Sequence, residues 1–365
     1  MSQTSAVSLI GLVKKTFYPV TSRFFSRATV VEGRLRGVDD SFRCLFVDNS
    51  TFTEYLKARM YEEPPAVLRR WRVWIPALKK LISRKTVSFD LCVAVLPQAY
   101  ESAFRGLYDY KCTESVRQVI DTSGSWEDVR GRFSKTKRQI TNRFAEKYGL
   151  GYRISNDPGE FDYFYHRMFA PHIKKRFGEL SSIDSYEDLK TFFLKGLLLF
   201  VTKGGEKVAG ALCLVKDGTL VFRRTGVLDG DETHVEGGAQ LALYYFQLKY
   251  ANEHRLRAVD TMMSAPFLND GVYVNKKEWG AAVFPDDESP TWVYYFCAAP
   301  SEKMARFFEK NPTIVHSDAG LKGLIGASGA TDISTVSVND LTRRYQSSGL
   351  HGFTILTGAG ALSAS

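Results

Sequence analysis

The sequence has few cysteines, and their arrangement suggests no structural site. The five cysteines among 365 residues are widely scattered and odd in number, with no CxxC pair and no Cys/His spacing of the zinc-binding kind. This excludes a disulfide framework and a zinc site, so we expect no metal and a reducing, cytoplasmic compartment. The glycine-rich phosphate loop of P-loop proteins is also missing.

Long hydrophobic runs and early acidic residues are missing as well. Even the apolar run 192–201 is interrupted by Lys195, so no run reaches the length of a membrane span. The first thirty-one residues contain no acidic side chain but many Ser and Thr, with four basic residues: Lys14, Lys15, Arg23 and Arg27. This composition is typical of a transit peptide, of an arm on a membrane surface, or of a loosely packed tail. Peripheral membrane attachment is therefore the alternative to a purely cytoplasmic location.

The net positive charge comes entirely from the first part of the chain. Residues 1–150 contain 26 basic and 15 acidic residues, whereas the remainder contains 23 and 25, for a net charge of +9 overall. The basic clusters include 69–72 and 130–147, and they are mixed with Trp71, Trp74 and Trp126. Such a surface fits an anionic partner, for which lipid head groups, a nucleotide-linked sugar and tRNA are the candidates. A solvated basic face without a ligand is the alternative.

The pattern from 197 to 260 predicts a meander followed by a helix and a strand. Three short apolar runs, 197–201, 208–215 and 220–222, are separated by glycine-containing turns, which is typical of consecutive strands. The turn 234–239 contains Gly237 and Gly238, and the apolar residues from 241 to 251 then recur at close to helical period. A short strand over 257–260 follows.

The glycine turn has a physical role in this pattern. A helix N-terminus presents unpaired N–H groups and a partial positive charge, which together can hold an anion such as a pyrophosphate. Glycine lets the backbone adopt positive φ and approach a ligand closely. The order of meander, glycine turn, helix and strand resembles the acyl-donor site of GNAT-type acyltransferases. Gly237, Gly238 and Ala239 fit the pyrophosphate signature of that family, although His234 stands where Gln or Arg is usual, and an ordinary helix-start turn is the alternative.

Further motifs extend the resemblance to Fem-type peptidyl transferases and their GNAT-like relatives of polysaccharide and lipid gene clusters. The segments 260–266, 270–273 and 275–280 resemble the closing pattern of those proteins, with a strand-end Asp, a loop with Pro, and Lys before an aromatic-Gly pair. Segments 133–150 and 161–178 resemble their basic helix and the helix that follows. The matches cover about 126 to 296. The resemblance implies an α/β (α+β) fold of tandem GNAT-like units, each a mixed sheet with splayed central strands flanked by helices.

The domain organisation follows from this layout. We expect a basic N-terminal arm over 1–30, a degenerate GNAT-like unit over 31–124, a GNAT-like acyltransferase domain over 125–300, and an extension over 301–365. Ser123-Gly124-Ser125 predicts the junction, because Ser125 suits the N-cap of a helix starting at Trp126.

Acyl transfer needs a base for the incoming nucleophile and stabilisation of the developing oxyanion. Asp260 is the first candidate base, because it stands at the predicted end of a core strand, and His234 and Glu236 are the others. The resemblance implies that Gly237, Gly238, Ala239 and either Lys276 or Lys277 bind the donor, and that an acceptor lies near Tyr165, His172, Arg176 and Arg224. Tyr244 and Tyr245 are interpreted as core residues. For Asp260, the alternative is a cap of the Pro266 loop.

Two classes of function follow from these residues. The first is an N- or O-acyltransferase that uses acyl-CoA, or aminoacyl-tRNA, as a co-substrate and needs no bound cofactor; a lipid- or sugar-linked acceptor fits the resemblance. The second is a non-catalytic GNAT-fold protein that binds a phosphate-rich partner, which the departure at His234 favours. A nucleic-acid-binding role through the basic half is the weakest, because no known RNA- or DNA-binding motif is present.

Overall fold

The computed structural model describes residues 24–37, 39, 41–48, 50–84, 86–142, 144, 148–178, 183–329 and 335–364. Lys14, Lys15 and Arg23 of the basic arm lie outside the described residues, whereas Arg27 belongs to the first strand. The chain forms two compact units, each built from more than one segment. The first unit contains the chain up to Val116, Ser264–Val274, and everything from Val283 onward; the second contains Arg117–Met263 and Asn275–Ala282.

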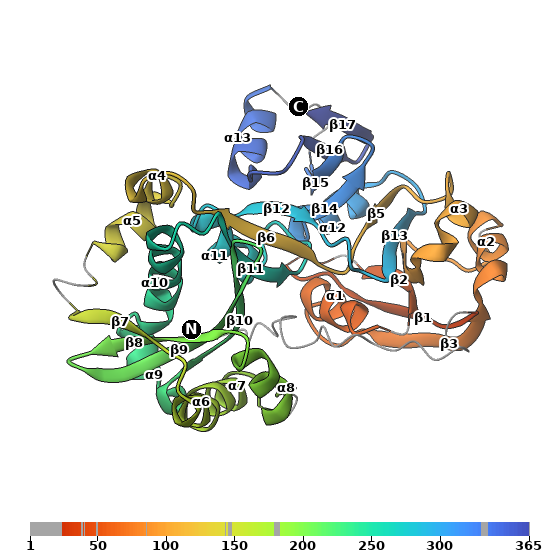
Figure 1. Cartoon of the computed structure of the whole chain (residues 1–365). Helices are drawn as coiled ribbons and strands as arrows, with labels where there is room; N and C mark the ends of the chain where they lie inside the picture. The colour runs from red at the N-terminus through yellow and green to blue at the C-terminus, as the bar shows by residue number, and fades with distance from the viewer. Residues whose placement is uncertain are drawn as a thin grey trace. The chain divides into compact units, whose positions relative to one another are not determined.

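The first unit is built on a six-stranded mixed sheet of order β3-β1-β2-β4-β13-β5 (Figure 1). β2 and β4 are parallel, and the pairs β1–β2, β1–β3, β4–β13 and β13–β5 are antiparallel. The elements are β1 (Phe25–Arg34), β2 (Ser41–Asp48), α1 (Phe52–Met60), β3 (Ala66–Trp74), α2 (Ile75–Ser83), β4 (Leu91–Pro97), η3 (Gln98–Tyr100), α3 (Glu101–Phe104), β5 (Tyr110–Cys112) and β13 (Thr291–Cys297).

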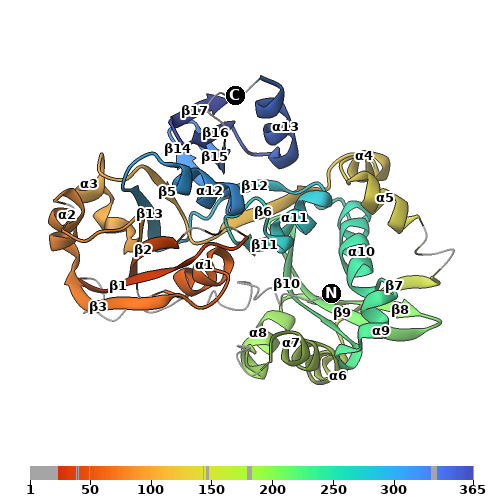
Figure 2. The same ribbon diagram turned by 180° about the vertical axis from the view of Figure 1, so that it is seen from behind.

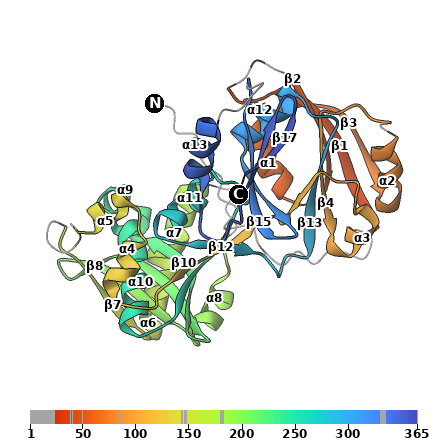
Figure 3. The same ribbon diagram turned by 90° about the horizontal axis from the view of Figure 1, so that it is seen from above.

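Helices cover both faces of this sheet, as Figure 3 shows for α1 and α12 on one side and α2 and α3 on the other. Alternate residues of each strand enter separate cores: Cys44 and Phe46 of β2 pack in the core that contains α1, whereas Leu45 and Val47 pack in the core that contains α2.

The C-terminal part of the chain completes the first unit. Helix α12 packs against the sheet, with Phe307 stacked on Phe42 at 5.5 Å between ring centroids. A four-stranded sheet of order β14-β15-β16-β17 follows. Residues 301–365, expected to form a separate extension, therefore belong to the first unit. The elements are α12 (Glu302–Lys310), β14 (Thr313–Ser317), β15 (Gly320–Gly326), α13 (Thr335–Tyr345), β16 (Phe353–Thr357) and β17 (Gly360–Ala364).

The second unit is built on the strands β6-β11-β10-β9-β8-β7, in that order across the sheet. The elements are β6 (Val116–Asp121), α4 (Trp126–Gly131), α5 (Lys135–Thr141), β7 (Leu150–Ser155), α6 (Pro158–Tyr163), the π-helical turn η4 (Phe164–Phe169), α7 (Ala170–Phe177), α8 (Tyr186–Phe193), β8 (Leu197–Lys203), β9 (Glu206–Lys216), β10 (Thr219–Val227), η6 (Leu228–Gly230), α9 (Glu232–Glu236), α10 (Ala239–Glu253), β11 (Ala258–Ser264) and the second half of α11 (Gly271–Glu278). Strand β12 (Ala282–Pro285) begins at the last residue of this unit and continues in the first.

Helix α10 covers one face of this sheet, and α6, η4 and α8 cover the other (Figure 2). Leu199 and Val201 of β8 join the core with α10, whereas Leu198 and Phe200 join the core with η4 and α8. Both units are thus mixed sheets flanked by helices, which confirms the predicted α/β class.

Most predicted elements of the second unit are confirmed, including the meander β8–β10, helix α10 and the Ser125 cap. Ser125 and Asp128 form a reciprocal capping box at the start of α4. For the basic, tryptophan-bearing segment 66–82 the sequence pattern predicts a helix, and this prediction was wrong. The first half of the segment is strand β3, and α2 begins only at Ile75, with Pro76 in its first turn. Among the described residues, no helix is long and apolar enough to cross a membrane.

Candidate active site

The central feature of the second unit is the separation of β10 from β11. The two parallel strands pair over only three positions, of which Val221↔Asp260 is the last. Beyond it, β10 continues to Val227, paired with β9, and β11 continues to Ser264. The register of β10 also shifts between Phe222 and Arg224, which places a bulge at Arg223. The predicted splay is therefore present, but Asp260 lies within β11 rather than at its end.

A glycine starts the long helix that follows β10. Gly238 is the N-cap of α10, with φ +85° in the left-handed region, and its carbonyl accepts from the Ala242 N–H at 2.8 Å. The first amides of a helix have no partner within the helix, so this turn offers the N–H groups and partial charge of an anion site. Ala239 is buried beneath it.

His234 and Glu236 lie on α9, before the glycines. Glu236 is exposed, and His234 is half-buried. The pKa of Asp229 is lowered mainly by a hydrogen bond from Arg167 and slightly by His234, so His234 lies close to Asp229. His234 therefore lies near acidic side chains. It stands at the position of the signature where Gln or Arg is usual.

Asp260 is buried, and both of its carboxylate oxygens are engaged. Oδ1 accepts from the Met262 N–H at 2.9 Å, and Oδ2 accepts from Arg117 Nε at 2.9 Å and from its Nη2. Met262 has φ +64°, which is uncommon for a residue with a side chain. Asp260 thus fixes an unusual backbone conformation while a guanidinium pairs with its carboxylate, and these interactions occupy both oxygens.

Lys276 supports the same stretch of β11. Its side chain is buried, and Nζ donates to the carbonyls of Met262 and Met263 at 3.1 and 2.8 Å. Lys277 is half-buried, and burial lowers its pKa. The two lysines therefore have different surroundings, and Lys276 holds the backbone of β11 in place.

Three helices bring a second polar cluster together around Tyr244. Tyr244 of α10 stacks on Trp279, with ring planes 4° apart, and lies edge-on to Phe222 of β10. Burial raises the pKa of Tyr244 to about 12, against the opposing effects of a hydrogen bond from Asn275 and the charge of Arg176. From the sequence, Tyr244 is expected in the core, and Asn275 is given no role.

Lys137 orients Asn275 within this cluster. The buried Lys137 Nζ donates to Asn275 Oδ1 at 2.8 Å and lies 3.3 Å from a carboxylate oxygen of Glu278. Because the amide oxygen faces Lys137, the amide nitrogen is directed to the Tyr244 hydroxyl. The phenol oxygen is therefore held as an acceptor, which leaves its proton available for donation.

His172 and Arg176 lie one turn apart on α7. Burial lowers the pKa of His172 to about 4, and the charge of Arg176 adds to this effect. The charge of Arg176 thus acts on both His172 and Tyr244, although these two residues are more than sixty positions apart along the chain. The position of η4, which leads directly into α7, depends on Gly226 of β10, where a Cβ atom would collide with the backbone of Met168.

The remaining predicted residues, Tyr165 and Arg224, meet at Asp184. The Tyr165 hydroxyl donates to the Asp184 carbonyl at 3.0 Å, and Arg224 Nε donates to its carboxylate. Arg223, at the bulge, lies over the ring of Phe192 at 4.1 Å, and its Nε is buried without a hydrogen-bond partner among the described residues. Asp184 itself gave no sequence signal.

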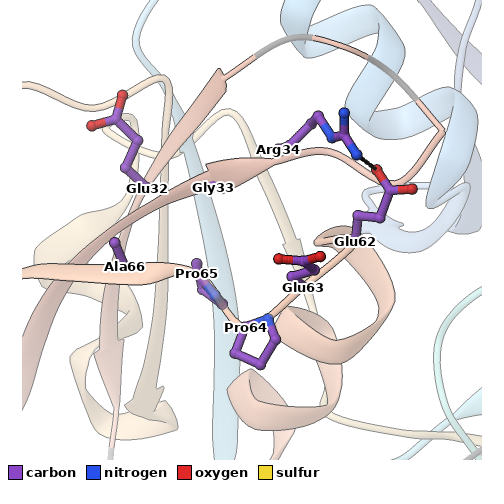
Figure 4. A pocket seen from close by; sticks show the side chains of 8 residues that line it. All are labelled: Glu32, Gly33, Arg34, Glu62, Glu63, Pro64, Pro65 and Ala66. Carbon is purple, nitrogen blue, oxygen red and sulfur yellow. Dashed lines mark ion pairs between the residues drawn. The ribbon is translucent and has the colours of Figure 1, made fainter.

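A pocket of about 210 Å³ lies in the first unit and contains none of these residues. It lies beside β1 and β3, and three of its eight lining residues are glutamates: Glu32, Glu62 and Glu63 (Figure 4). Arg34 pairs with Glu62 at 2.8 Å. Within the described residues, no group of three or more His, Cys, Asp or Glu is placed to hold a metal ion.

The pKa of His172 predicts how acid affects stability. The unfolded chain takes up a proton at this histidine near pH 6.5, whereas the folded chain does so only near pH 4. Stability is therefore lost as the pH falls through this window, by about 3 kcal/mol from this group. Denaturant unfolding at pH 7 and pH 4 should show a smaller loss in His172→Gln. Exposed His166, on the same helical segment, supplies the control: a loss equally reduced in His166→Gln would contradict the assignment.

The sequence matches no protein-family model and no curated protein. Among solved structures the chain is similar to FemX, with a TM-score of 0.40 and 11% identity, over 74% of this chain and 84% of that one. It is also similar to the C-terminal domain of a putative lysylphosphatidylglycerol synthetase from Agrobacterium fabrum, with a TM-score of 0.37 and 13% identity, over 73% and 80%. For L-PGS from Bacillus licheniformis the values are 0.36 and 11%, over 73% and 83%.

The second unit has a meander, a glycine turn, a helix and a parallel strand that separates from its neighbour. This is the order of elements that the sequence predicts, in an α/β unit.

Proposed function

We propose that the second unit is an acyltransferase. The observation that carries the proposal is the separation of β10 from β11 beyond Val221 and Asp260, together with the left-handed Gly238 that caps the N-terminus of α10. In this proposal the acyl-bearing arm of the donor lies along the unpaired edge of β10, where backbone groups can bond to its amides. The donor phosphates lie at the N-terminus of α10. Acyl-CoA is the donor we favour, and aminoacyl-tRNA is the alternative.

Tyr244 is assigned as the proton donor to the leaving group. The acceptor attacks the carbonyl carbon, the bond from that carbon to the leaving sulfur or oxygen breaks, and the Tyr244 proton moves to the leaving atom. With a pKa of about 12, Tyr244 carries its proton throughout the neutral range. Asn275, held by Lys137, fixes the phenol oxygen and stabilises the phenolate that forms.

His172 is assigned as the group that receives the proton of the acceptor amine or hydroxyl. Its pKa of about 4 leaves the imidazole unprotonated at neutral pH, so a ring nitrogen can accept. Asp260, the base expected from the sequence, becomes a positioning residue here, because Arg117 and the Met262 N–H occupy its oxygens. Lys277 and His234 remain candidates for the donor phosphates, and Tyr165 and Arg224 for the acceptor.

Replacing Gly238 with valine tests the donor site. The φ of +85° is strained for a β-branched residue, and the added side chain blocks approach of the phosphates to the first amides of α10. We expect Gly238→Val to abolish acyl-CoA binding in calorimetry. Gly205, with φ +89° in the β8–β9 turn and open space around it, is the matched control. Gly205→Val should retain binding; unchanged affinity in a folded Gly238→Val would remove the donor site.

A non-catalytic GNAT-fold protein is the second candidate. The observation that favours it is the engagement of both Asp260 oxygens, which leaves the carboxylate expected to act as the base without that role. Binding of acyl-CoA without turnover, across a panel of amine and hydroxyl acceptors, would support this alternative. Turnover that depends on Tyr244 would exclude it.

A further inference from the structure

Strand β3 of the first unit is an edge strand with little cover. It lies at the end of the six-stranded sheet beside β1 (Figure 1). Of its nine residues only Val73 is buried, and Trp71 is half-buried; both pack on the core that contains α2. The strand is therefore anchored through one face, and its opposite face is uncovered. A long exposed edge strand is usually shortened, covered or charged in soluble proteins.

The uncovered face carries arginines beside two aromatic rings. The register places Phe25 opposite Trp74 and Arg27 opposite Arg72, and cross-strand partners share a face. Arg70 follows on the same side of β3. Phe25 and Trp74 are 42% and 52% exposed, and Arg72 lies over the Phe25 ring at 5.3 Å. We call this surface, formed by Phe25, Arg27, Arg70, Arg72 and Trp74, the Arg–aromatic face.

The positive charge of this face is largely uncompensated. Within the described part of the chain, none of Arg27, Arg70 and Arg72 forms an ion pair of salt-bridge length. Like charges directly opposite each other on paired strands repel, as Arg27 and Arg72 do. On β2 the residue opposite Arg27 is Asp48, and burial raises the pKa of its carboxyl to about 7. This carboxyl therefore carries less negative charge at neutral pH than an exposed aspartate.

The surrounding sequence extends the positive field. Residues 64–89 contain seven basic and no acidic residues, including Lys79, Lys80 and Arg84 on and after α2. The acidic residues lie beyond the other end of the strand, where Glu32 stands opposite Ala66 at the pocket of Figure 4. An external anion would relieve the repulsion, and the two exposed rings indicate a partner that is also apolar.

We propose that the Arg–aromatic face docks the first unit on an anionic lipid bilayer. Phe25 and Trp74 lie at the level of the head groups, and Arg27, Arg70 and Arg72 bind lipid phosphates. Aromatic side chains with an exposed apolar body suit this interface, and each arginine near an anionic membrane adds to binding. Val67 and Leu68, 53% and 50% exposed on β3, fit a bilayer better than RNA, because aliphatic chains do not stack on bases. This inference does not depend on the acyltransferase proposal.

Vesicle sedimentation with the full chain tests this docking. We expect binding to vesicles of phosphatidylglycerol and phosphatidylcholine, little binding to phosphatidylcholine alone, and release when salt is raised from about 0.1 M to about 1 M, where screening shortens from ~10 to ~3 Å. The variant Arg27→Gln/Arg70→Gln/Arg72→Gln should bind about a hundredfold more weakly, since each arginine contributes about fivefold. Trp74→Ala should weaken binding about tenfold, through lost apolar burial.

A charge-matched variant separates this face from net charge. Lys195, Lys203 and Lys216 are exposed in the second unit, and Lys195→Gln/Lys203→Gln/Lys216→Gln removes the same charge as the arginine variant. Vesicle binding should survive in this control. Equal loss in both variants, equal binding to neutral vesicles, or no vesicle binding by the native chain would overturn the proposal. So would an arginine variant that loses only RNA binding or self-association, measured by filter binding and sedimentation velocity.

Discussion

Replacing Tyr244 with phenylalanine is expected to lower turnover by about a hundred- to ten-thousand-fold, the usual contribution of general acid–base catalysis. The variant keeps the ring that stacks on Trp279 and packs against Phe222, and loses only the proton that the leaving group needs. The affinity for acyl-CoA should therefore change little. Steady-state kinetics together with calorimetry measures the two effects separately, once an acceptor has been identified.

Tyr245 is the matched control for this prediction. It is the next residue of α10, half-buried, and its ring lies edge-on to Trp126 at 5.4 Å. Tyr245→Phe removes the same hydroxyl from the same helix and should retain turnover. Full activity in Tyr244→Phe would return Tyr244 to the core role that the sequence suggests, and the proton donor would then have to be sought among other groups near β10.

Replacing Arg117 with methionine is expected to destabilise the second unit by about 3 kcal/mol. Removing one partner of a buried ion pair leaves the other charge without compensation, and costs about 3–5 kcal/mol. We place the effect at the lower end because the Arg117 side chain is 44% exposed, whereas that of Asp260 is 1% exposed. Hydrogen exchange of peptides from β10 and β11 during urea unfolding measures the second unit alone. Equal protection in variant and native protein would contradict the prediction.

The double variant Arg117→Met/Asp260→Asn distinguishes the two roles considered for Asp260. A neutral amide needs no counter-ion, so most of the lost stability should return if the carboxylate serves to hold Met262. In that case Asp260→Asn alone should affect turnover mainly through the affinity for substrates. A large fall in kcat with unchanged substrate affinity and unchanged stability would instead restore the base role predicted from the sequence.

Helix starts and the meander could be predicted because their determinants are local. Ser125 and Ser301 precede helices and accept from backbone amides of the first turn. Strand β3 could not be predicted in this way, because its basic and tryptophan residues suit an exposed helix equally well. Only its pairing with β1 makes this segment a strand. Strand β15 could not be predicted either, because its glycines suggest a loop. Gly323 is required by packing, since a Cβ atom at this position would collide with the ring of Phe353.

The candidate site was predictable in part. His172, Arg176, Gly238 and Lys276 were named from motifs, and the charge of Arg176 acts on both His172 and Tyr244. The partner of Asp260 could not be predicted, because Arg117 is 143 positions away and carries no motif. A sequence pattern identifies residues of suitable chemistry; which of them meet depends on how β6, α7, α10 and α11 pack.

The segmented first unit determines the order in which the chain can fold during synthesis. β13 stands between β4 and β5 in the sheet, yet it is made after nearly all of the second unit. Until it emerges, β4 and β5 each lack a neighbour and expose unpaired backbone to solvent. The second unit, with the continuous stretch Arg117–Met263, can meanwhile form most of its sheet. The first unit to be started is thus the last to be finished, and its open strands would be the ones in need of a chaperone.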